Sequence, residues 1–212
     1  MFADRAAAGK RLAEALLAPG GLDLSSAGPP IVLGLPRGGL PVARAVADAL
    51  AAPLDVLVVR KLGAPGHAEY AIGAIGPGGI RVIDQEAAAA VGATADSLAD
   101  IERQEAAELV RRESRFRAGR APLDLAGRTA IIVDDGVATG ATAGVACRAA
   151  RALGASRVIL AVPVAPAAWV TRLGDAADAY VAVETPRHFW AVGQHYRDFR
   201  QTSDEEVLAA LR

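Results

Sequence analysis

Residues 130–142 of the chain read Ala-Ile-Ile-Val-Asp-Asp-Gly-Val-Ala-Thr-Gly-Ala-Thr. The four apolar residues at its start do not alternate with polar ones, which favours a strand buried on both faces of a parallel sheet. Two carboxylates, Asp134 and Asp135, follow where that strand should end, and residues 143–153 read as the next helix. Ligands bind outside the carboxyl ends of the strands in open α/β sheets, so the stretch predicts a site at the two acids.

The loop after the acids has the chemistry of a phosphate site. Gly140 permits close backbone approach, Thr139 and Thr142 supply hydroxyl donors, and a helix start offers free N–H groups and a partial positive charge. The two carboxylates would repel a phosphate, so they need another partner, and an ionised Asp accepts hydrogen bonds well from a sugar diol. Adjacent strand residues point to opposite faces, so both acids reach one sugar only if the chain already turns at Gly136.

The stretch resembles the phosphoribosyl pyrophosphate (PRPP) motif of type I phosphoribosyltransferases, with an apolar strand, two acids, two small or apolar residues and a Thr-Gly-x-Thr loop. One alternative is a plain strand–turn–helix in which Asp135 caps a turn. A P-loop nucleotide-binding protein also has an apolar strand ending in acids, but it needs G-x-x-x-x-G-K-[ST]. The Gly9-Lys10 pair follows Asp4 rather than a glycine, so that pattern is absent.

Composition points to one soluble domain. The chain has 212 residues, 52% of them hydrophobic, and a chain of this length buries roughly 70% of its unfolded surface. Its formal net charge of −1 gives no overall attraction to nucleic acid or an anionic membrane. The single cysteine, Cys147, suits a reducing compartment, and no apolar run reaches the ~18 residues of a membrane span. Residues 2–17 read as an amphipathic helix rather than a signal peptide. We expect a single cytoplasmic domain over residues 1–212, with no membrane or nucleic-acid partner.

A second glycine-rich loop follows a predicted strand at residues 31–33. It reads Gly-Leu-Pro-Arg-Gly-Gly-Leu-Pro over residues 34–41 and precedes a predicted helix at residues 42–51. Pro36 interrupts the G-x-G-x-x-G spacing, so a dinucleotide fingerprint is not present. The loop resembles the pyrophosphate loop of the same family, with Arg37, Gly38 and Gly39 facing the leaving group. Alone it would indicate only a tight strand–helix turn.

The next predicted strand, residues 54–59, ends in Arg60-Lys61. Two adjacent cations repel each other unless an anion is near, and all but two of the 23 basic residues of the chain are arginine, so Lys61 is unusual. The family resemblance implies that this pair faces pyrophosphate, and solvated charges at a sheet edge are the alternative. Residues 62–79 resemble the mobile loop that closes over the site. They show a β-ribbon pattern continued by residues 80–83, and we see no dense apolar face to hold the segment down. His67 there contacts pyrophosphate, shuttles a proton or is simply exposed.

Residues 95–118 are predicted to form a long charged helix capped by Thr94 or Asp96. Arginines and glutamates alternate along it, so a solvated face or a dimer contact is favoured over nucleic acid. Strands are expected at residues 158–162 and 179–183, and helices at 167–173 and, capped by Ser203, at 204–211. Residues 184–202 correspond to the hood that covers the acceptor base in this family. There Phe189 or Trp190 either stacks on a base or seals the core.

The resemblance implies one doubly wound α/β domain with a mostly parallel sheet flanked by helices, a small hood and a mobile β-ribbon loop. It also implies a homodimer that transfers 5-phosphoribose between PRPP and a nitrogenous base with Mg²⁺ as cofactor, releasing pyrophosphate in the forward direction. Asp134 and Asp135 would hold the ribose hydroxyls and lie near Mg²⁺, mainly through ribose and pyrophosphate oxygens or water. The implied catalytic residues are Asp134, Asp135 and Lys61, and the implied substrate-binding residues are Arg37, Gly38, Gly39, Arg60, Ala138, Thr139, Gly140, Ala141, Thr142 and Trp190.

One departure concerns the acceptor. Family members acting on 6-oxopurines carry an Asp directly before the loop Thr, whereas this chain has Ala138. The chain also looks like a bacterial branch of the family that carries Leu-Pro-Arg-Gly-Gly and Val-Arg-Lys-Leu-Gly, for which the resemblance supplies no acceptor. The alternative function is a PRPP-sensing regulator that binds RNA or DNA. It would need a basic face or an added DNA-binding domain, and the sequence shows neither.

Overall fold

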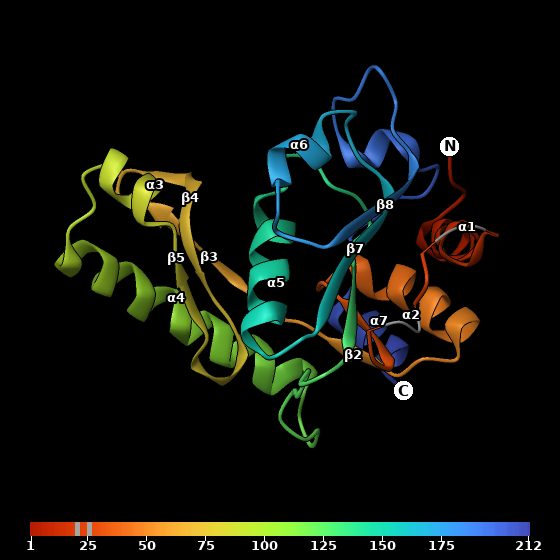
Figure 1. The fold of residues 1–212 in the computed structure, drawn as a ribbon, viewed down its shortest axis with the longest axis horizontal. Helices are drawn as coiled ribbons and strands as arrows, with labels where there is room; N and C mark the ends of the chain where they lie inside the picture. Colours follow the sequence, from red (N-terminus) through yellow and green to blue (C-terminus); the bar gives the residue numbers. More distant parts are fainter. Residues whose placement is uncertain (20–21, 25–26) are drawn as a thin grey trace.

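The computed structural model describes residues 1–19, 22–24 and 27–212. Its centre is a parallel sheet of five strands in the order β2-β1-β6-β7-β8 (Figure 1). This arrangement confirms the predicted α/β class with a mostly parallel sheet. The strands are β1 (Pro30–Gly34), β2 (Leu54–Val56), β6 (Thr129–Val133), β7 (Arg157–Val164) and β8 (Ala179–Glu184).

Helices cover both faces of this sheet. Successive strand residues point to opposite faces, and β6 shows this clearly. Ile131 and Val133 pack with helices α1 (Arg5–Leu17) and α2 (Gly39–Leu50), whereas Ile132 packs with α5 (Ala141–Ala152) and α6 (Trp169–Leu173). All five residues of β6 are buried, which explains the apolar run without alternation in the sequence.

Four predicted helix starts were misplaced: those expected at residues 143 and 167 lie at Ala141 and Trp169, and two others are off by three residues. The first helix begins at Arg5 rather than at residue 2, because the Asp4 side chain caps it by accepting a hydrogen bond from the Ala7 N–H at 2.7 Å. The second begins at Gly39 rather than at residue 42. Pro41 therefore lies in the first turn of α2, where its missing N–H has no helical partner to lose. The earlier start brings the end of the second glycine loop into the helix.

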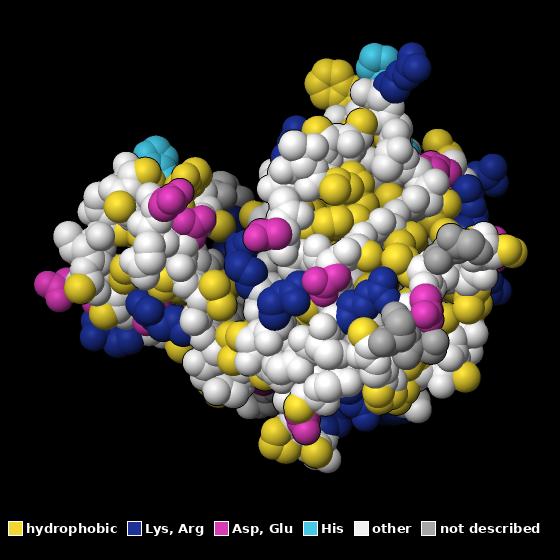
Figure 2. All heavy atoms as spheres, viewed as in Figure 1, with side chains coloured by type: hydrophobic (Ala, Val, Ile, Leu, Met, Phe, Trp, Pro, Cys, Tyr) yellow, Lys and Arg dark blue, Asp and Glu magenta, His cyan; other side chains and the backbone are white. Residues whose placement is uncertain are grey.

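Residues 60–116 form an arm that stands beside the central sheet, next to α5 (Figure 1). Its antiparallel sheet has the order β3-β4-β5, with strands β3 (Arg60–Ala64), β4 (His67–Ile75) and β5 (Arg81–Ile83). A short 3-10 helix, η1 (Pro77–Gly79), joins the last two strands, and helices α3 (Gln85–Ala90) and α4 (Ala95–Phe116) follow. In the space-filling view the arm is a smaller lobe beside the body, with a notch between the two on this face (Figure 2). The predicted β-ribbon is confirmed.

Two expectations about the arm were wrong. The strand expected over residues 54–59 ends at Val56, and Arg60 and Lys61 begin a strand of the second sheet instead of ending one of the first. The segment 62–79 also has an apolar face. Leu62 and Ile72 are fully buried and pack in one cluster with Leu109 and Phe116 of α4. Thr94 caps α4 as predicted, and Leu109 and Phe116 give that helix a buried apolar face on the small sheet beside its charged face.

The C-terminal part packs against helices α2 and α4 and against the N-terminus. After β8 the chain forms a short 3-10 helix, η2 (Val192–His195), and ends with α7 (Asp204–Ala210), which contacts both α2 and α4. Ser203 caps α7 as predicted, in a reciprocal pair of hydrogen bonds with Glu206. Tyr196 packs against Phe2 with ring centroids 5.3 Å apart, so the segment after β8 is tied to the N-terminus. Among the described residues no helix is both long and apolar enough to cross a membrane.

Candidate functional site

The two acids lie at the carboxyl edge of the parallel sheet, just beyond the end of β6. The strand stops at Val133, and the Asp135 N–H donates to Asp134 Oδ1 at 2.9 Å, so the chain has already left the extended conformation at the acids. The chain bends at Asp135, one residue before the turn expected at Gly136, and the reach of both carboxylates to one ligand stays a prediction. Val192 of η2 packs over Gly136, where an added Cβ would meet a Val192 methyl at 2.6 Å. The segment after β8 therefore closes the side of this turn.

Arg5 holds Asp135 from the N-terminal helix. Its Nε donates to Asp135 Oδ2 at 2.8 Å, and the two side chains are only 12% and 15% exposed. The same guanidinium donates to the Arg200 carbonyl at 2.8 Å and lies over the Phe199 ring at 4.1 Å from its centroid. The Tyr196 hydroxyl donates to the Asp135 carbonyl oxygen at 2.6 Å. The sequence reasoning missed Arg5, because it is one of many arginines and lies 130 positions from Asp135.

Burial makes both carboxylates costly to ionise. It raises the pKa of Asp134 well above its ordinary value, and the neighbouring charge of Asp135 adds to this effect. Burial also raises the pKa of Asp135, although the hydrogen bond from Arg5 opposes the shift. A ligand that donates hydroxyl hydrogen bonds, or that brings a cation, would stabilise the ionised forms. Adjacent carboxyls with raised pKa values at a sheet edge are typical of functional sites.

A small hollow of about 150 Å³ lies between the acids and the start of α5. Gly140 has φ of +88°, a conformation that favours glycine, and it caps the helix that begins at Ala141. Thr139 Oγ1 accepts from the Ala141 N–H at 3.4 Å. The N–H groups of the first helical turn and the threonine hydroxyls suit a phosphate group, as predicted. The hollow is lined by Asp134 and by residues 136–143, which include the predicted Ala138, Thr139, Gly140, Ala141 and Thr142.

The second glycine loop touches the two acids directly. A Cβ on Gly38 would lie 2.0 Å from Asp135 Oδ2, and one on Gly39 would lie 2.7 Å from the Val133 carbonyl oxygen. The loop is held there by the Leu35 N–H, which donates to the same carbonyl at 2.9 Å. Only glycine fits at both positions, so the contact between the loop and the acids explains the Gly-Gly pair. The structure thus brings the two predicted loops together.

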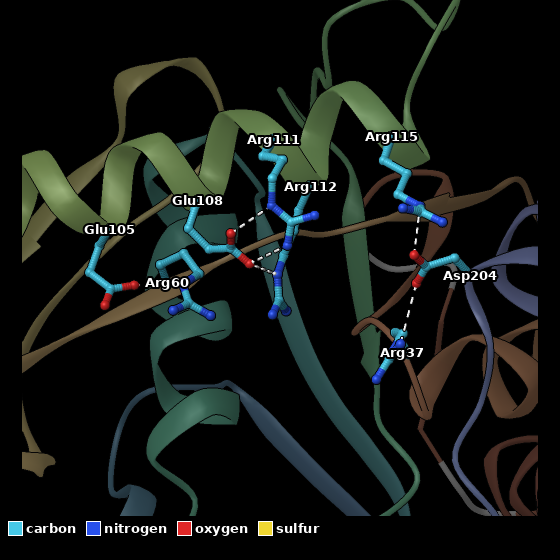
Figure 3. Close-up of polar contacts among 8 residues, drawn as sticks. All are labelled: Arg37, Arg60, Glu105, Glu108, Arg111, Arg112, Arg115 and Asp204. Carbon is cyan, nitrogen blue, oxygen red and sulfur yellow. Dashed lines mark hydrogen bonds and ion pairs between the residues drawn. The ribbon is translucent and has the colours of Figure 1, made fainter.

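Arg37 pairs with the start of α7. One terminal nitrogen of its guanidinium, NH1, lies 3.5 Å from Asp204 Oδ1 at the start of α7, and Arg115 of α4 pairs with the same carboxylate at 2.5 Å (Figure 3). The contact of Arg37 with the leaving group stays a prediction. Its carboxylate partner was not foreseen because Asp204 lies 167 positions further along the chain.

Arg60 and Lys61 line a larger cavity of about 560 Å³ between the body and the arm. Pro36 of the second glycine loop and Thr142 of the first loop line it as well, so the basic pair faces both loops. Arg60 Nε donates to Glu105 Oε2 of α4 at 2.6 Å. The sequence reasoning missed the contribution of α4, because its charged residues look alike whether they face solvent or a cavity. The α4 residues lining the cavity are Ile101, Gln104, Glu105 and Arg112.

The aromatic pair of the hood segment separates into two environments. Phe189 is half-buried and stacks on the His195 ring at 5.5 Å between centroids, so it belongs to the core. Trp190 is 88% exposed. His67, at the start of β4, is exposed as well. Base stacking by Trp190 and a role for His67 in the chemistry remain predictions.

The fold and the site define an α/β protein with two acids and two glycine-rich loops at the carboxyl edge of a parallel sheet. The chain belongs to the phosphoribosyl transferase domain family, whose match covers residues 7–199. It is 51% identical over 211 residues to a Mycobacterium tuberculosis (strain CDC 1551 / Oshkosh) protein provisionally named a phosphoribosyl transferase, and equally to the protein of strain H37Rv. That match covers 100% of this chain and 46% of each relative, so the chain spans about half the length of the curated relatives it matches. A solved protein from Thermus thermophilus, TT1426, is 44% identical, with a TM-score of 0.86 over 99% of this chain and 97% of the other.

Proposed function

We propose that this protein transfers the 5-phosphoribosyl group between PRPP and a nitrogenous base, with Mg²⁺ as cofactor and pyrophosphate as the product of the forward reaction. Membership of the phosphoribosyl transferase family supports this class of activity. The observation that carries the proposal is the contact between the Gly38-Gly39 turn and the two acids, beside the hollow at the start of α5. Transfer requires that the surfaces binding the sugar, its 5′-phosphate and its leaving group lie next to one another. The two acids, the hollow and the Gly38-Gly39 turn are these three surfaces in the proposal.

Different residues bind the different groups of the substrate. Asp134 and Asp135 accept hydrogen bonds from the ribose hydroxyls, and the loop 138–142 binds the 5′-phosphate. Arg60, Lys61 and the loop that carries Gly38 and Gly39 bind pyrophosphate. As the bond from C1′ to pyrophosphate breaks, the carboxylates favour the positive charge that develops on the ring, and the cations stabilise the departing oxygens. Binding energy on the remote phosphate holds the reacting atoms in place.

The donor groups present suit a metal held largely by the substrate. Among the described residues there is no group of three or more His, Cys, Asp or Glu side chains that could hold a metal ion. Mg²⁺ commonly uses one or two carboxylates, substrate phosphates and several waters. Asp134 and Asp135 supply such carboxylates, and one oxygen of each is already engaged, by the Asp135 N–H and by Arg5 respectively. When bound, Mg²⁺ would neutralise charge on pyrophosphate and polarise its oxygens.

The acceptor is a base without a strict need for an acidic partner at position 138, since the loop carries the exposed Ala138 there instead of an Asp. The Trp190 side chain is exposed, so it is available to stack on a base when the hood segment approaches the site. A homodimer, a cytoplasmic location and the absence of a nucleic-acid partner stay predictions from the sequence.

The test is PRPP binding measured by calorimetry in Mg²⁺. Asp134→Asn and Asp135→Asn each remove a charged acceptor and should weaken binding by roughly 1.5–3 kcal/mol. Asp175→Asn, which neutralises an exposed acid in the turn after α6, is the matched control and should change nothing. Unchanged affinity in both site variants would refute the proposal. A product assay by mass spectrometry, with PRPP, Mg²⁺ and a panel of purines, pyrimidines and pyridine carboxylates, would then identify the acceptor.

A further inference from the structure

The cavity of about 560 Å³ has walls from four parts of the chain, and one of them is a helix that the proposed function does not use. The second glycine loop contributes Pro36, the first loop contributes Thr142, and β3 contributes its two cations. Helix α4 closes the remaining side. Its lining residues Ile101, Gln104, Glu105 and Arg112 are spaced so that they fall on one helix face.

The charges around this cavity favour an anion. Three cations line it, Arg60, Lys61 and Arg112, against one carboxylate, Glu105. Two of the cations are held by glutamates of α4: Glu105 accepts from Arg60 Nε at 2.6 Å, and Glu108 accepts from Arg112 Nε at 2.6 Å. The hydrogen bonds from Arg111 and Arg112 lower the pKa of Glu108 to about 2, so it stays ionised at neutral pH.

Arg112 has the right geometry to serve a bound anion while keeping its partner. Its bond to Glu108 is made by Nε, and a guanidinium has further N–H donors on its terminal nitrogens. Figure 3 shows the Arg112 side chain running from α4 to the level of Arg60. Bidentate recognition by arginine suits phosphate oxygens in particular.

We infer that α4 completes the pyrophosphate subsite: Arg112, positioned by Glu108, is a third cationic ligand of the pyrophosphate group, and Glu105 holds Arg60 when that group is absent. This inference rests on the proposed function. It gives the arm a role beyond support, because packing of Leu109 and Phe116 on the small sheet fixes the helix that carries Arg112. Binding of pyrophosphate then replaces the Arg60–Glu105 ion pair with a contact between Arg60 and a phosphate oxygen.

Arg111 provides a matched control on the same helix. It is adjacent to Arg112 and also bonds Glu108, through two hydrogen bonds of 2.8 Å. Its side chain is 62% exposed, against 35% for Arg112, which lines the cavity. Replacing either arginine removes one hydrogen-bond partner of Glu108 and one positive charge from α4. Only the loss of Arg112 removes a cation from the cavity.

The experiment measures the affinities of inorganic pyrophosphate with Mg²⁺ and of ribose 5-phosphate by calorimetry. Arg112→Ala should weaken pyrophosphate by about 10-fold to 100-fold, as expected for a lost charge-assisted hydrogen bond, and leave ribose 5-phosphate unchanged. Arg111→Ala should leave both affinities unchanged. Glu105→Gln should strengthen pyrophosphate binding by about twofold to fivefold, because Arg60 no longer has to leave an ion pair. A gain in affinity cannot come from damage to the arm, so this variant tests the second part of the inference, that Glu105 holds Arg60, even if Arg112→Ala fails to fold, and an unchanged affinity would refute that part.

Three results would overturn the inference. Equal effects of Arg112→Ala and Arg111→Ala on pyrophosphate, with binding by the unmodified protein intact, would refute it and leave the proposed function standing. A parallel loss of ribose 5-phosphate affinity in Arg112→Ala would show that α4 only supports the fold. A protein that binds neither pyrophosphate nor PRPP in Mg²⁺ would refute the proposed function itself, and the inference with it.

Discussion

Replacing Arg5 by Ala should destabilise the protein strongly, because it leaves Asp135 buried without its ionic partner. The two side chains are 12% and 15% exposed and are joined at 2.8 Å. Removing one partner of a buried ion pair typically costs 3–5 kcal/mol. Because both groups keep some exposure, we take the low end, about 3 kcal/mol. For a protein of this size that corresponds to a fall in melting temperature of roughly 6–12 °C.

Arg11→Ala is the matched control. Arg11 lies on the same helix, pairs with Glu184 at 3.0 Å and lies over the Phe2 ring at 4.9 Å from its centroid, but its side chain is 48% exposed. An ion pair as exposed as this contributes about 0–1 kcal/mol, so the control variant should lose little. The contrast between the two variants isolates burial, because helix, residue type and kind of partner are the same.

A double-mutant cycle measures the cause of the loss. If Arg5→Ala acts by stranding a charge, adding Asp135→Asn should recover part of the stability, with a coupling of about 1–3 kcal/mol. Urea denaturation at neutral pH gives the free energies of unfolding. The penalty of Arg5→Ala should also shrink in acid, because Asp135 becomes protonated. An Arg5→Ala loss no larger than that of Arg11→Ala, or strict additivity with Asp135→Asn, would refute the reasoning.

Two further predictions concern the first acid and the arm. The pKa of Asp134 is raised in the folded state, so its contribution to stability is present below the unfolded pKa of about 3.9 and is lost as the pH rises through the folded value. Asp134→Asn should therefore raise the free energy of unfolding at pH 8, and the gain should fade towards pH 4 in urea titrations. A gain independent of pH would contradict this. In the arm, amide hydrogen exchange should be fast at Gly66 and His67, which are exposed, slow at the buried Leu62 and Ile72, and slower at the turn once PRPP and Mg²⁺ bind. Fast exchange throughout residues 62–79 would restore the fully open loop expected from the sequence.

The parts of the fold predicted correctly are those set by local sequence. Residues 130–142 carry the whole signal for a buried strand, two acids at its end and a helix after the loop, which was predicted from residue 143 and begins at Ala141, and each of these features lies within a few positions of its cause. Thr94 and Ser203 were recognised as helix caps for the same reason, since a cap bonds an N–H three residues away. Placement of the two acids beyond the end of a strand followed from the rule that ligands bind at the carboxyl edge of such sheets.

The wrong predictions concern features that depend on residues far away in the sequence. The segment 62–79 reads as a loose loop because it is rich in Gly, Ala and Pro, and the apolar partners of Leu62 and Ile72 come from α4. Tertiary packing against α4 therefore determines the structure of this segment, and local composition does not. Arg5 and Arg112 were missed for a related reason. In a chain with this many arginines, residue type does not distinguish an arginine that faces a site from one that faces solvent, and only the fold does.

The two ends of the site depend on different parts of the chain. The acid end is held by the N-terminal helix and by the segment after β8, through Arg5, Phe199 and Tyr196. The opposite end lies against the arm, where α4 faces Arg60 and Lys61. If the proposed function holds, damage to one set of contacts should therefore weaken binding of the ligand group at that end first, the ribose for Arg5 and pyrophosphate for Arg112. The Gly38-Gly39 turn touches the acids and belongs to the loop whose Pro36 lines the larger cavity, so this loop borders both ends of the site.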